Sequence, residues 1–596
     1  MTGGAPDRQA RSSLLPRFAD TSAVLGGVGW LLLVVADVFG PIQDIIALAM
    51  LVLVPLALRL ADTPRRDGTR SGWYRIAVVG QPMTALLGVF SLTMTPGTAT
   101  ALSALPWAAT TVAVAGFGVW RLLQRGPWPI EELSIDAGLL YIVVGGVALL
   151  FDRTGVSLVF EPTFVTLTTV HFHYAGSALP ILAGMAGRYS PGERFDPMVR
   201  WTTPLIVVGP GIIGTGITAV ALDFPLAATI EFIAVAIFTT AVTLFSVAVI
   251  VGVLPLLPSW PQRLLLGGAS LAVTVSMGFA VVYGFARATG GTYLGIGPQS
   301  LGTMVTYHGQ LNAYGFAVPA LVGWRLAVPE SRARPPGVPV SHLTGGWSIG
   351  EDFLERRGLT GDATVSGMID DVGAYQSDTF DSSAVSSSVR QFFERSGEYE
   401  LAVSPDWETP WRQLAILYHP IATRIGQLSV PLVSATGELA LSGRVVAVND
   451  GDSQTGDRAW IRSNVGRATG ADRMTYVGIY DRHVSTGRSY LRVTFPLPGS
   501  NLTGMLRVKN GGADDEALVL SSFPEAGNCD DAGLYLVVGG FAVRLPLNET
   551  LLVEPGEERG SVQAVHRVEL FGVRVFTLQY DLRLADNDSP SNGISR

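Results

Sequence analysis

Cysteine and lysine are almost absent from this chain of 596 residues. Cys529 is the single cysteine, which excludes an intramolecular disulfide framework and any metal or iron–sulfur site built from several cysteines. Lys509 is the single lysine, so arginine supplies nearly all of the positive charge. Charged residues make up only 15% of the chain, against about 25% in ordinary soluble domains. This shortage indicates that a large part of the chain does not face water.

The charge deficit is confined to the first part of the chain. Residues 1–340 hold 19 basic and 16 acidic residues (19 − 16 = +3), whereas residues 341–596 hold 22 basic and 33 acidic residues (22 − 33 = −11), and the two parts sum to the net charge of −8. An apolar first part and an acidic second part predict a membrane domain followed by a water-soluble one. The acidic second part argues against a nucleic-acid partner, which requires a basic surface.

Apolar runs of bilayer-spanning length, about ten in number, follow one another in the first part. They lie near residues 22–39, 41–60, 74–94, 101–122, 134–151, 162–187, 202–222, 224–252, 264–286 and 302–325. We interpret the first run as a retained anchor and not as a cleaved signal peptide. Of the 19 arginines, only Arg153 and Arg287 fall in one set of alternate loops. This bias predicts a cytoplasmic-membrane protein with both termini in the cytoplasm.

The second part changes to short alternating strands separated by Gly, Asn and Asp, with one amphipathic helix near 408–424. The predicted fold class is therefore an α-helical integral membrane bundle of about ten transmembrane helices followed by a β-rich soluble domain, an antiparallel barrel or sandwich. The expected organisation is a membrane domain at 1–328, a linker with short helical segments at 329–397, a cytoplasmic β-rich domain at 398–586 and a disordered tail at 587–596.

Two polar segments, 169–180 and 308–319, interrupt the apolar runs. They align without gaps at an offset of 139 residues (315 − 176 = 139), which places Gly176 on Gly315 and Pro180 on Pro319. This register indicates a parallel repeat of four spans each. Histidine, glutamine and asparagine at membrane depth cost free energy unless they find partners, so they mark a candidate functional site.

Seven residues at or near this depth form the predicted substrate- or ion-binding site. They are His171, His173, Ser177, Glu231, His308, Gln310 and Asn312. His171 and His173 lie two residues apart, about 200° around a helix, so at most one of them points toward a shared centre unless the helix breaks. We expect His173 and His308 to exchange protons or coordinate a cation, with Asn312 and Gln310 orienting them.

The sequence leaves other interpretations open. In one of them, the same polar groups serve merely to hydrogen-bond between helices, which would suit a non-catalytic membrane scaffold. They could also belong to a metal- or haem-binding redox protein, with His173 and His308 as ligands, although no cofactor is predicted. No catalytic motif is present, so an enzyme has little support. The expected partners are the lipid bilayer and a small solute or hydrophobic ligand, and the oligomeric state stays open.

The segment His-Phe-His-Tyr-Ala-Gly at 171–176, together with the weaker segment at 308–319, resembles the YndJ family of multi-spanning membrane proteins. Ser177 stands where that family pattern would have a bulky apolar residue. The resemblance implies the architecture of the ten-span part, with the soluble domain as an appended unit. It implies a transporter-like protein without an assigned substrate.

Overall fold

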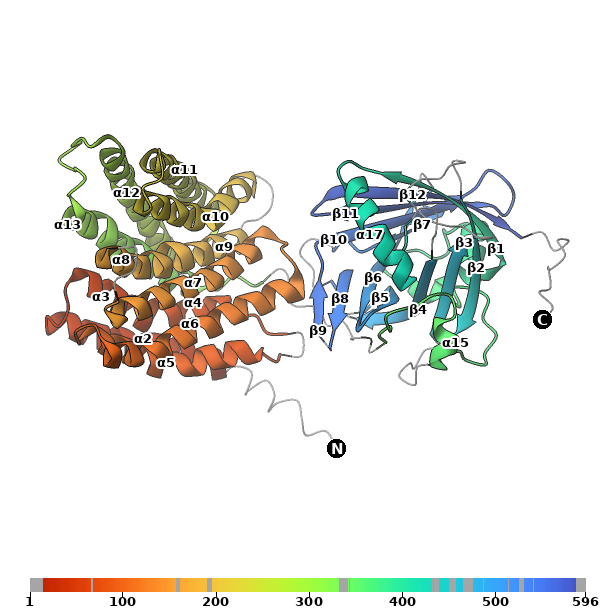
Figure 1. Ribbon diagram of the computed structural model, residues 1–596, viewed down its shortest axis with the longest axis horizontal. Coiled ribbons are helices and arrows are strands. Elements are labelled where there is room, and N and C mark those ends of the chain that lie inside the picture. The colour runs from red at the N-terminus through yellow and green to blue at the C-terminus, as the bar shows by residue number, and fades with distance from the viewer. Residues whose placement is uncertain are drawn as a thin grey trace, which may run out of the picture. The chain divides into compact units, whose positions relative to one another are not determined.

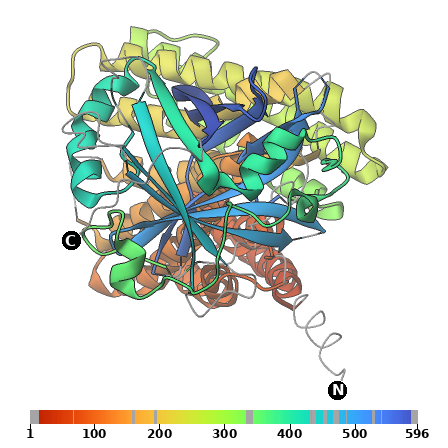
Figure 2. The same cartoon turned by 90° about the vertical axis from the view of Figure 1, so that its right-hand side faces the viewer.

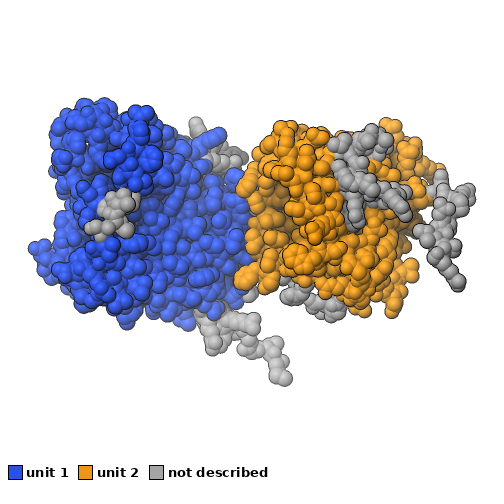
Figure 3. Space-filling model, in the orientation of Figure 1, with its two compact units in different colours: residues 1–335 blue, residues 336–596 orange. Residues whose placement is uncertain are grey.

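The computed structural model places two compact units along the chain, Met1–Pro335 and Pro336–Arg596, which are coloured separately in Figure 3. It describes residues 14–65, 68–156, 161–189, 196–331, 341, 343–430, 432, 439–449, 457–464, 475–485, 487–512, 514–524, 530–539 and 541–585. Cys529 and the predicted tail at 587–596 lie outside the described residues.

Helices make up the first unit. They are α2 (Leu14–Val35), α3 (Pro41–Leu48), η1 (Ala49–Leu53), α4 (Val54–Ala61), α5 (Gly72–Leu92), α6 (Thr98–Arg125), α7 (Ile130–Thr154), α8 (Pro162–His173), η2 (Tyr174–Ala178), α9 (Leu179–Tyr189), α10 (Asp196–Ala221), α11 (Ala227–Ala248), η3 (Val249–Val253), η4 (Leu254–Leu256), α12 (Trp260–Thr289), α13 (Leu301–Met304), η5 (Val305–Ala317) and α14 (Val318–Leu326). Within the described part of the chain, eight continuous segments are long and apolar enough to cross a membrane. The predicted membrane bundle is therefore confirmed.

The two remaining predicted spans are the helical segments that carry the polar residues. One runs through α8, η2 and α9, and the other through α13, η5 and α14. Each is continuous in the backbone, but each contains a π-helical stretch in place of regular α-helix. Counted with the eight apolar segments, they reproduce about ten spans.

Each of the four π-helical stretches ends two residues before a proline. The stretches η1, η2, η3 and η5 end at Leu53, Ala178, Val253 and Ala317, and the prolines are Pro55, Pro180, Pro255 and Pro319. Proline has no N–H group and its ring collides with the carbonyl one turn earlier, so a widened turn before it relieves the collision. The ends of η2 and η5 are separated by 139 residues (317 − 178 = 139), the offset of the sequence repeat.

The membrane helices pack in chain order within two groups. Helices α5, α6 and α7 contact one another in sequence and α7 contacts α8 and α9, while α10, α11 and α12 contact one another in sequence and α12 contacts η5 and α14. Figure 1 shows the red and orange helices α2–α7 on one side and the olive helices α10–α12 on the other, with α8 and α9 between them. The large apolar core of this unit spans both groups.

Strands dominate the second unit (Figures 1 and 2). They are β1 (Tyr399–Trp407), β2 (Leu439–Ala447), β3 (Arg458–Asn464), β4 (Thr475–Ser485), β5 (Arg488–Leu497), β6 (Ser500–Gly511), β7 (Ala517–Ser521), β8 (Gly533–Val538), β9 (Phe541–Arg544), β10 (Leu547–Pro555), β11 (Val562–Leu570) and β12 (Val573–Leu584). They form one sheet in the order β5-β4-β3-β2-β1-β12-β11-β10-β7-β6-β8-β9, and β5 also pairs with β6. Ten strands therefore close into an antiparallel barrel, and β8 and β9 extend from β6. Of the two predicted β architectures, the barrel is the one observed.

Short helices that precede the barrel pack against its strands. They are α15 (Phe353–Arg357), η6 (Val372–Tyr375), α16 (Ser387–Glu394) and η7 (Ser396–Glu398). Val389, Phe392 and Phe393 of α16 are buried in the same cluster as Tyr399 and Trp460 of the strands. The described residues from 343 to 397 thus belong to the second unit and fall within the segment 329–397, which was predicted to be a linker with short helical segments. The apolar side chains of η6 and α16 fill one end of the barrel, whereas those of α15 belong to a separate cluster with Ala459 and Ile461.

A helix covers the opposite end of the barrel. The predicted amphipathic helix near 408–424 is α17 (Trp411–Ile425), and it follows directly after β1. Ala415, His419 and Ala422 are its buried residues. Leu417 and Ile421 are exposed, at 72% and 56%. Ala415, His419 and Ala422 therefore face the barrel, whereas Leu417 and Ile421 face outward.

Candidate functional site

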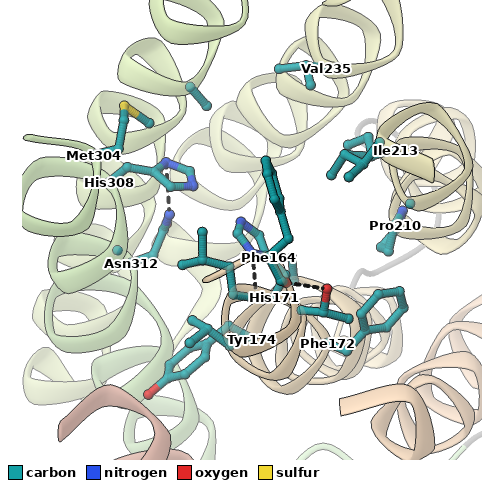
Figure 4. Close-up of a pocket in the computed structure, with 18 of the residues that line it drawn as sticks. Phe164, His171, Phe172, Tyr174, Pro210, Ile213, Val235, Met304, His308 and Asn312 are labelled. Carbon is teal, nitrogen blue, oxygen red and sulfur yellow. Dashed lines mark hydrogen bonds between the residues drawn. The ribbon is translucent and has the colours of Figure 1, made fainter. Parts of the chain in front are cut away.

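A cavity of about 970 Å³ lies within the membrane unit, between α7 and α8 on one side and α10, α11, α12 and η5 on the other. Figure 4 shows His171 of α8 and His308 and Asn312 of η5 on one part of its wall, with Pro210 and Ile213 of α10 and Val235 of α11 across from them. Most of the lining side chains are apolar. A mostly apolar cavity with a few converging polar groups is typical of a ligand site.

His171 and His308 point toward one another in this cavity, although they come from different spans (Figure 4). Their ring centroids are 6.4 Å apart. Nδ1 of His171 donates to the carbonyl oxygen of Leu167 at 2.8 Å, and Nδ1 of His308 donates to the carbonyl oxygen of Ser276 at 3.0 Å. Among the described residues, no hydrogen bond uses Nε2 of either ring. Both rings are therefore held by the backbone through one nitrogen and leave the other for the cavity.

The π-helical stretch η5 and helix α12 position His308. Oγ of Ser276 on α12 donates to the carbonyl oxygen of His308 at 3.2 Å and lies 3.1 Å from Nδ1 of its ring. The side-chain amide of Asn312, one turn further along, lies 3.3 Å from the same Nδ1. The stretch η5, whose backbone bonds join residues five apart in place of four, therefore carries several polar side chains beside α12.

Glu231 also lines the cavity, but at another level. Its carboxylate accepts from Arg287 of α12 at 3.0 Å, and the Arg287 guanidinium lies 5.9 Å from the ring centroid of Phe164. Ser276, which holds His308, is eleven residues before Arg287 on α12 (287 − 276 = 11), a rise of about 16 Å. The polar groups expected at one depth therefore lie at two depths. An ion pair lies near the start of α11 and the end of α12, and the imidazole pair lies deeper inside.

His173 lies outside the cavity lining, although we expected it to act with His308. Its Nδ1 donates to the carbonyl oxygen of Thr169 at 2.7 Å, and its Nε2 accepts from Nε1 of Trp107 at 3.3 Å. A Cβ atom at Gly145 of α7 would lie only 2.6 Å from Nδ1 of this ring. With both nitrogens bonded and the ring packed against a glycine, His173 joins α6, α7 and α8.

Ser177 and Gln310 are likewise not among the residues that line the cavity. Ser177 is buried at the contact with α7, where a Cβ atom at Gly138 would lie 2.6 Å from its carbonyl oxygen. Gln310 is partly buried, and no hydrogen bond among the described residues involves its side chain. Of the seven predicted site residues, the cavity therefore gathers His171, Glu231, His308 and Asn312.

The donor set limits the cofactors that this cavity could hold. The described residues contain no group of three or more His, Cys, Asp or Glu side chains placed to hold a metal ion. His171 and His308 form a pair of imidazoles, each with Nδ1 bonded to a carbonyl, as is common for metal-ligating histidines. A site built from them would need further ligands from water or from the bound molecule.

A second polar cluster, which sequence reasoning missed, lies at the other end of these helices. Arg121 at the end of α6 and Arg188 at the end of α9 donate to Glu132 at the start of α7, at 2.6 Å and 2.7 Å. Arg121 also bonds Asp136 at 2.8 Å, and Arg125 forms an ion pair with Asp136 as well. All five side chains are buried. We name this set the arginine clasp.

Sequence reasoning counted Arg121, Arg125 and Arg188 only toward the loop charge that sets membrane orientation. The clasp also bonds the end of α4, because Arg121 donates to the carbonyl oxygen of Ala61 at 2.8 Å. The one available signal was the presence of acidic residues in the first turns of α7, opposite arginines that end neighbouring spans.

The fold and the cavity define a multi-pass α-helical membrane protein with an attached β-barrel unit. Residues 44–316 match the model of the YndJ-like protein family. The membrane protein YndJ of Bacillus subtilis (strain 168) is 29% identical to the chain over 503 residues, which cover 84% of this chain and 86% of that protein. Both comparisons confirm the resemblance to the YndJ-like family that the His-Phe-His-Tyr-Ala-Gly segment indicated.

The comparison also bears on the second unit. The first unit ends at residue 335, so a match of 503 residues must extend into the barrel unit. The Bacillus protein therefore shares at least part of that unit, which was expected to be an appended domain. No solved structure matches the chain.

Proposed function

We propose that this protein translocates or senses a small solute or lipid-like molecule through the membrane cavity, with His171 and His308 as its polar centre. The observation that carries the proposal is that two imidazoles from separate spans face one another, and that their Nε2 atoms form no hydrogen bond with any residue that the structure describes. Polar side chains at membrane depth are costly. Such groups are expected where they meet a ligand, a proton or a cation.

Helix directions support an orientation for the cavity. Its lining reaches Glu161 before α8 and Gln299 before α13 at one end, and Leu179 and Phe316 at the other. The arginine clasp and the arginine-rich loops lie beyond that second end. The positive-inside rule places this end in the cytoplasm, so both termini and the barrel unit are cytoplasmic in our proposal and the Glu161 end faces outward.

In the proposed transport cycle, the clasp would keep the cytoplasmic end of the cavity closed. It joins the ends of α4, α6 and α9 to the start of α7 through buried ion pairs. A solute that leaves the cavity toward the cytoplasm would require these helix ends to separate. Alternating access of this kind moves one group of helices against another around a fixed central site.

Cysteine accessibility in membrane vesicles tests the proposal without knowledge of the substrate. Cys529 is first replaced by serine. Thr168→Cys then places a thiol in the cavity wall, one turn before His171. A membrane-impermeant thiol reagent should label it from the outer side. Its labelling rate is divided at each pH by that of a free thiol, because thiolate reactivity itself falls with pH. The ratio should change between pH 8 and pH 5, since imidazole is the side chain that gains a proton in this range.

His171→Ala and His308→Ala should each remove that pH dependence while the thiol stays accessible. Ser177→Cys is the matched control, because Ser177 is buried outside the cavity, and it should stay unlabelled. A Thr168→Cys thiol that no reagent reaches, or a pH response that survives in both histidine variants, would count against the proposal.

A metal- or haem-binding protein is the second candidate, and the carbonyl-bonded Nδ1 atoms of His171 and His308 favour it. Metal analysis and visible absorbance of the purified protein separate the two. A stoichiometric metal or a haem band that disappears in His308→Ala would favour this candidate. A colourless, metal-free protein with the pH response above would favour transport or sensing.

A further inference from the structure

The barrel of the second unit contains a cation held between two aromatic rings. Arg462 of β3 points into the barrel, between the ring of Trp460 at 4.4 Å and that of Tyr476 at 5.1 Å. Its Nε is buried without a hydrogen bond, and no carboxylate among the described residues forms an ion pair with it. Glu549, whose charge acts on Arg462 without forming an ion pair with it, bonds Nε2 of His566 at 2.9 Å. An unpaired cation inside a protein is costly, so an anion is expected beside it.

Hydrogen-bond donors accompany this guanidinium. Tyr476, Tyr480 and Tyr580 belong to the buried barrel cluster, yet their hydroxyl groups take part in no hydrogen bond among the described residues. Burial raises the pKa of all three phenols, so they remain O–H donors at neutral pH. Gly443 lies directly across from Arg462 on β2. The indole of Trp460 fills the space beside Gly443, where a Cβ atom would lie 2.7 Å from Nε1 of that ring. A ten-stranded barrel is wider than the eight-stranded barrels that hold one small ligand.

The strand register places Arg462 near the end of the barrel that α17 covers. The last residues of β1 and β3 and the first residues of β2 and β4 lie at one end, because Val403 pairs with Leu439, Leu441 with Asn464, and Ser463 with Thr475. Arg462 is two residues from the end of β3. The helix α17 starts four residues after β1 ends, at the same end.

The same end of the barrel is apolar. A smaller cavity of about 240 Å³ lies between α17 and the ends of β1 and β12, and Trp407, Trp411, Tyr418 and Phe576 are among its lining residues. The exposed face of α17 continues this surface with Leu414, Leu417 and Ile421. A molecule that enters here would meet aromatic and aliphatic side chains before it reaches the guanidinium.

We infer that the barrel binds an anionic amphiphile, with an oxyanion head group at Arg462 and the interior tyrosines and an apolar chain against the aromatic cavity under α17. Carboxylate and phosphate head groups both match a guanidinium that offers a planar set of donors. The inference concerns the second unit alone and does not depend on the function of the membrane cavity.

Photo-crosslinking of the full chain in lipid nanodiscs tests this inference. The probes are three diazirine-labelled molecules of equal chain length: a fatty acid, a lysophosphatidic acid and a fatty alcohol. Crosslinked peptides are mapped by mass spectrometry. At least one anionic probe should label peptides from β3, β4, β12 or α17 about tenfold more than the alcohol, since a charge-assisted bond contributes about 1.5–3 kcal/mol. The better of the two acids identifies the head group.

Arg462→Gln should reduce labelling by the anionic probe to the level of the alcohol. The matched control is Arg444→Gln, because Arg444 of β2 is exposed and paired with Glu355 at 2.9 Å, and it should label as the unmodified protein does. Equal labelling by acid and alcohol, or unchanged labelling of Arg462→Gln, would overturn the inference. The acid-to-alcohol ratio of the unmodified protein decides the question even if Arg462→Gln does not fold.

Discussion

The membrane unit holds two polar clusters that differ in how fully their groups are bonded. In the arginine clasp, Glu132 accepts from Arg121 and Arg188, and Ser331 also donates to it at 2.8 Å. At the imidazole pair, His171 and His308 each use one ring nitrogen for a carbonyl and present the other edge to a cavity. Every side chain of the clasp forms an ion pair with another member of the clasp, whereas each imidazole of the pair has one ring nitrogen that forms no hydrogen bond with a described residue.

The difference shows how polar residues at membrane depth should be sorted. Rarity and cost apply equally to both clusters, so neither identifies a functional site. A better criterion is a polar group that faces a cavity and has a donor or acceptor without a partner, because such a group can still bind another molecule. His173 makes the same point within one helix: two residues from His171, it has both nitrogens bonded and acts as a joint between helices.

The largest effect is expected from breaking the clasp. Glu132→Gln leaves Arg121 and Arg188 buried without their carboxylate and should lower the free energy of unfolding by about 3–5 kcal/mol. Glu231→Gln is the matched change, because Glu231 is partly exposed to the cavity and bonds one arginine, and it should cost far less. Thermal unfolding in detergent compares the two variants. Equal losses would remove the distinction between the clasp and the cavity.

The two neighbouring histidines provide the next contrast. His173→Ala deletes a buried ring and leaves the Trp107 N–H group unpaired, so it should cost about 2–3 kcal/mol. His171→Ala removes a ring that faces the cavity and should cost about 0.5 kcal/mol or less. Thermal unfolding of both variants measures the difference. A greater loss in His171→Ala would show that the cavity histidine, too, is structural.

The same contrast exists among the tyrosines of the barrel unit. Tyr490 is fully buried and donates to Asp530 at 2.9 Å, so Tyr490→Phe should cost about 1–2 kcal/mol. Tyr476→Phe removes a hydroxyl group without a described hydrogen bond and should cost less than about 0.5 kcal/mol. Denaturant unfolding followed by circular dichroism gives both values.

Tyr490 also makes stability depend on pH. Burial, and then the charge of Asp530, hold the pKa of Tyr490 above the ordinary value of a tyrosine. Because the folded pKa is the higher one, this contribution is complete below about pH 10 and is lost as the pH rises further. In Tyr490→Phe, the decline of stability above pH 10 should be shallower. An unchanged slope would assign the alkaline transition to other groups.

The smallest effect is expected on the outer surface of the barrel. Arg444 and Glu355 form an ion pair at 2.9 Å with both side chains about half exposed. Water screens such pairs, so Arg444→Gln should change the free energy of unfolding by less than about 0.5 kcal/mol. A loss of 2 kcal/mol or more, measured by the same unfolding assay, would indicate that this pair fixes α15 on the sheet.

The number of membrane helices and the β-rich character of the second unit could be predicted from the sequence because both follow from local periodicity. The run predicted at 101–122 is α6, and the helix predicted at 408–424 is α17, each displaced by only a few residues. The π-helical stretches were not predicted. They arise where the turn before a proline widens to avoid a collision with its ring, and periodicity alone does not show whether a helix responds to a proline in this way or by bending.

The candidate site was readable in part. Helix geometry predicted that His171 and His173 could not both face one centre, but it could not choose between them, because the choice depends on which side of α8 meets Gly145 of α7. The clasp was hidden for another reason. An arginine that ends a span gives the same sequence signal whether it faces the cytoplasm or pairs with an acidic residue of a neighbouring helix.

The widened turns before the prolines have a consequence for how one span serves two tasks. A π-helical turn adds one residue to the circumference, which rotates everything after it by about 100° relative to an uninterrupted α-helix. In the span that contains η2, His171 precedes this rotation and Gly184 and Gly187 follow it, where they fit against Glu131 and Ile135 of α7. The widened turn thus sets the angle around the helix axis between the side that faces the cavity and the side that packs against α7, so that each half of the span can face a different neighbour.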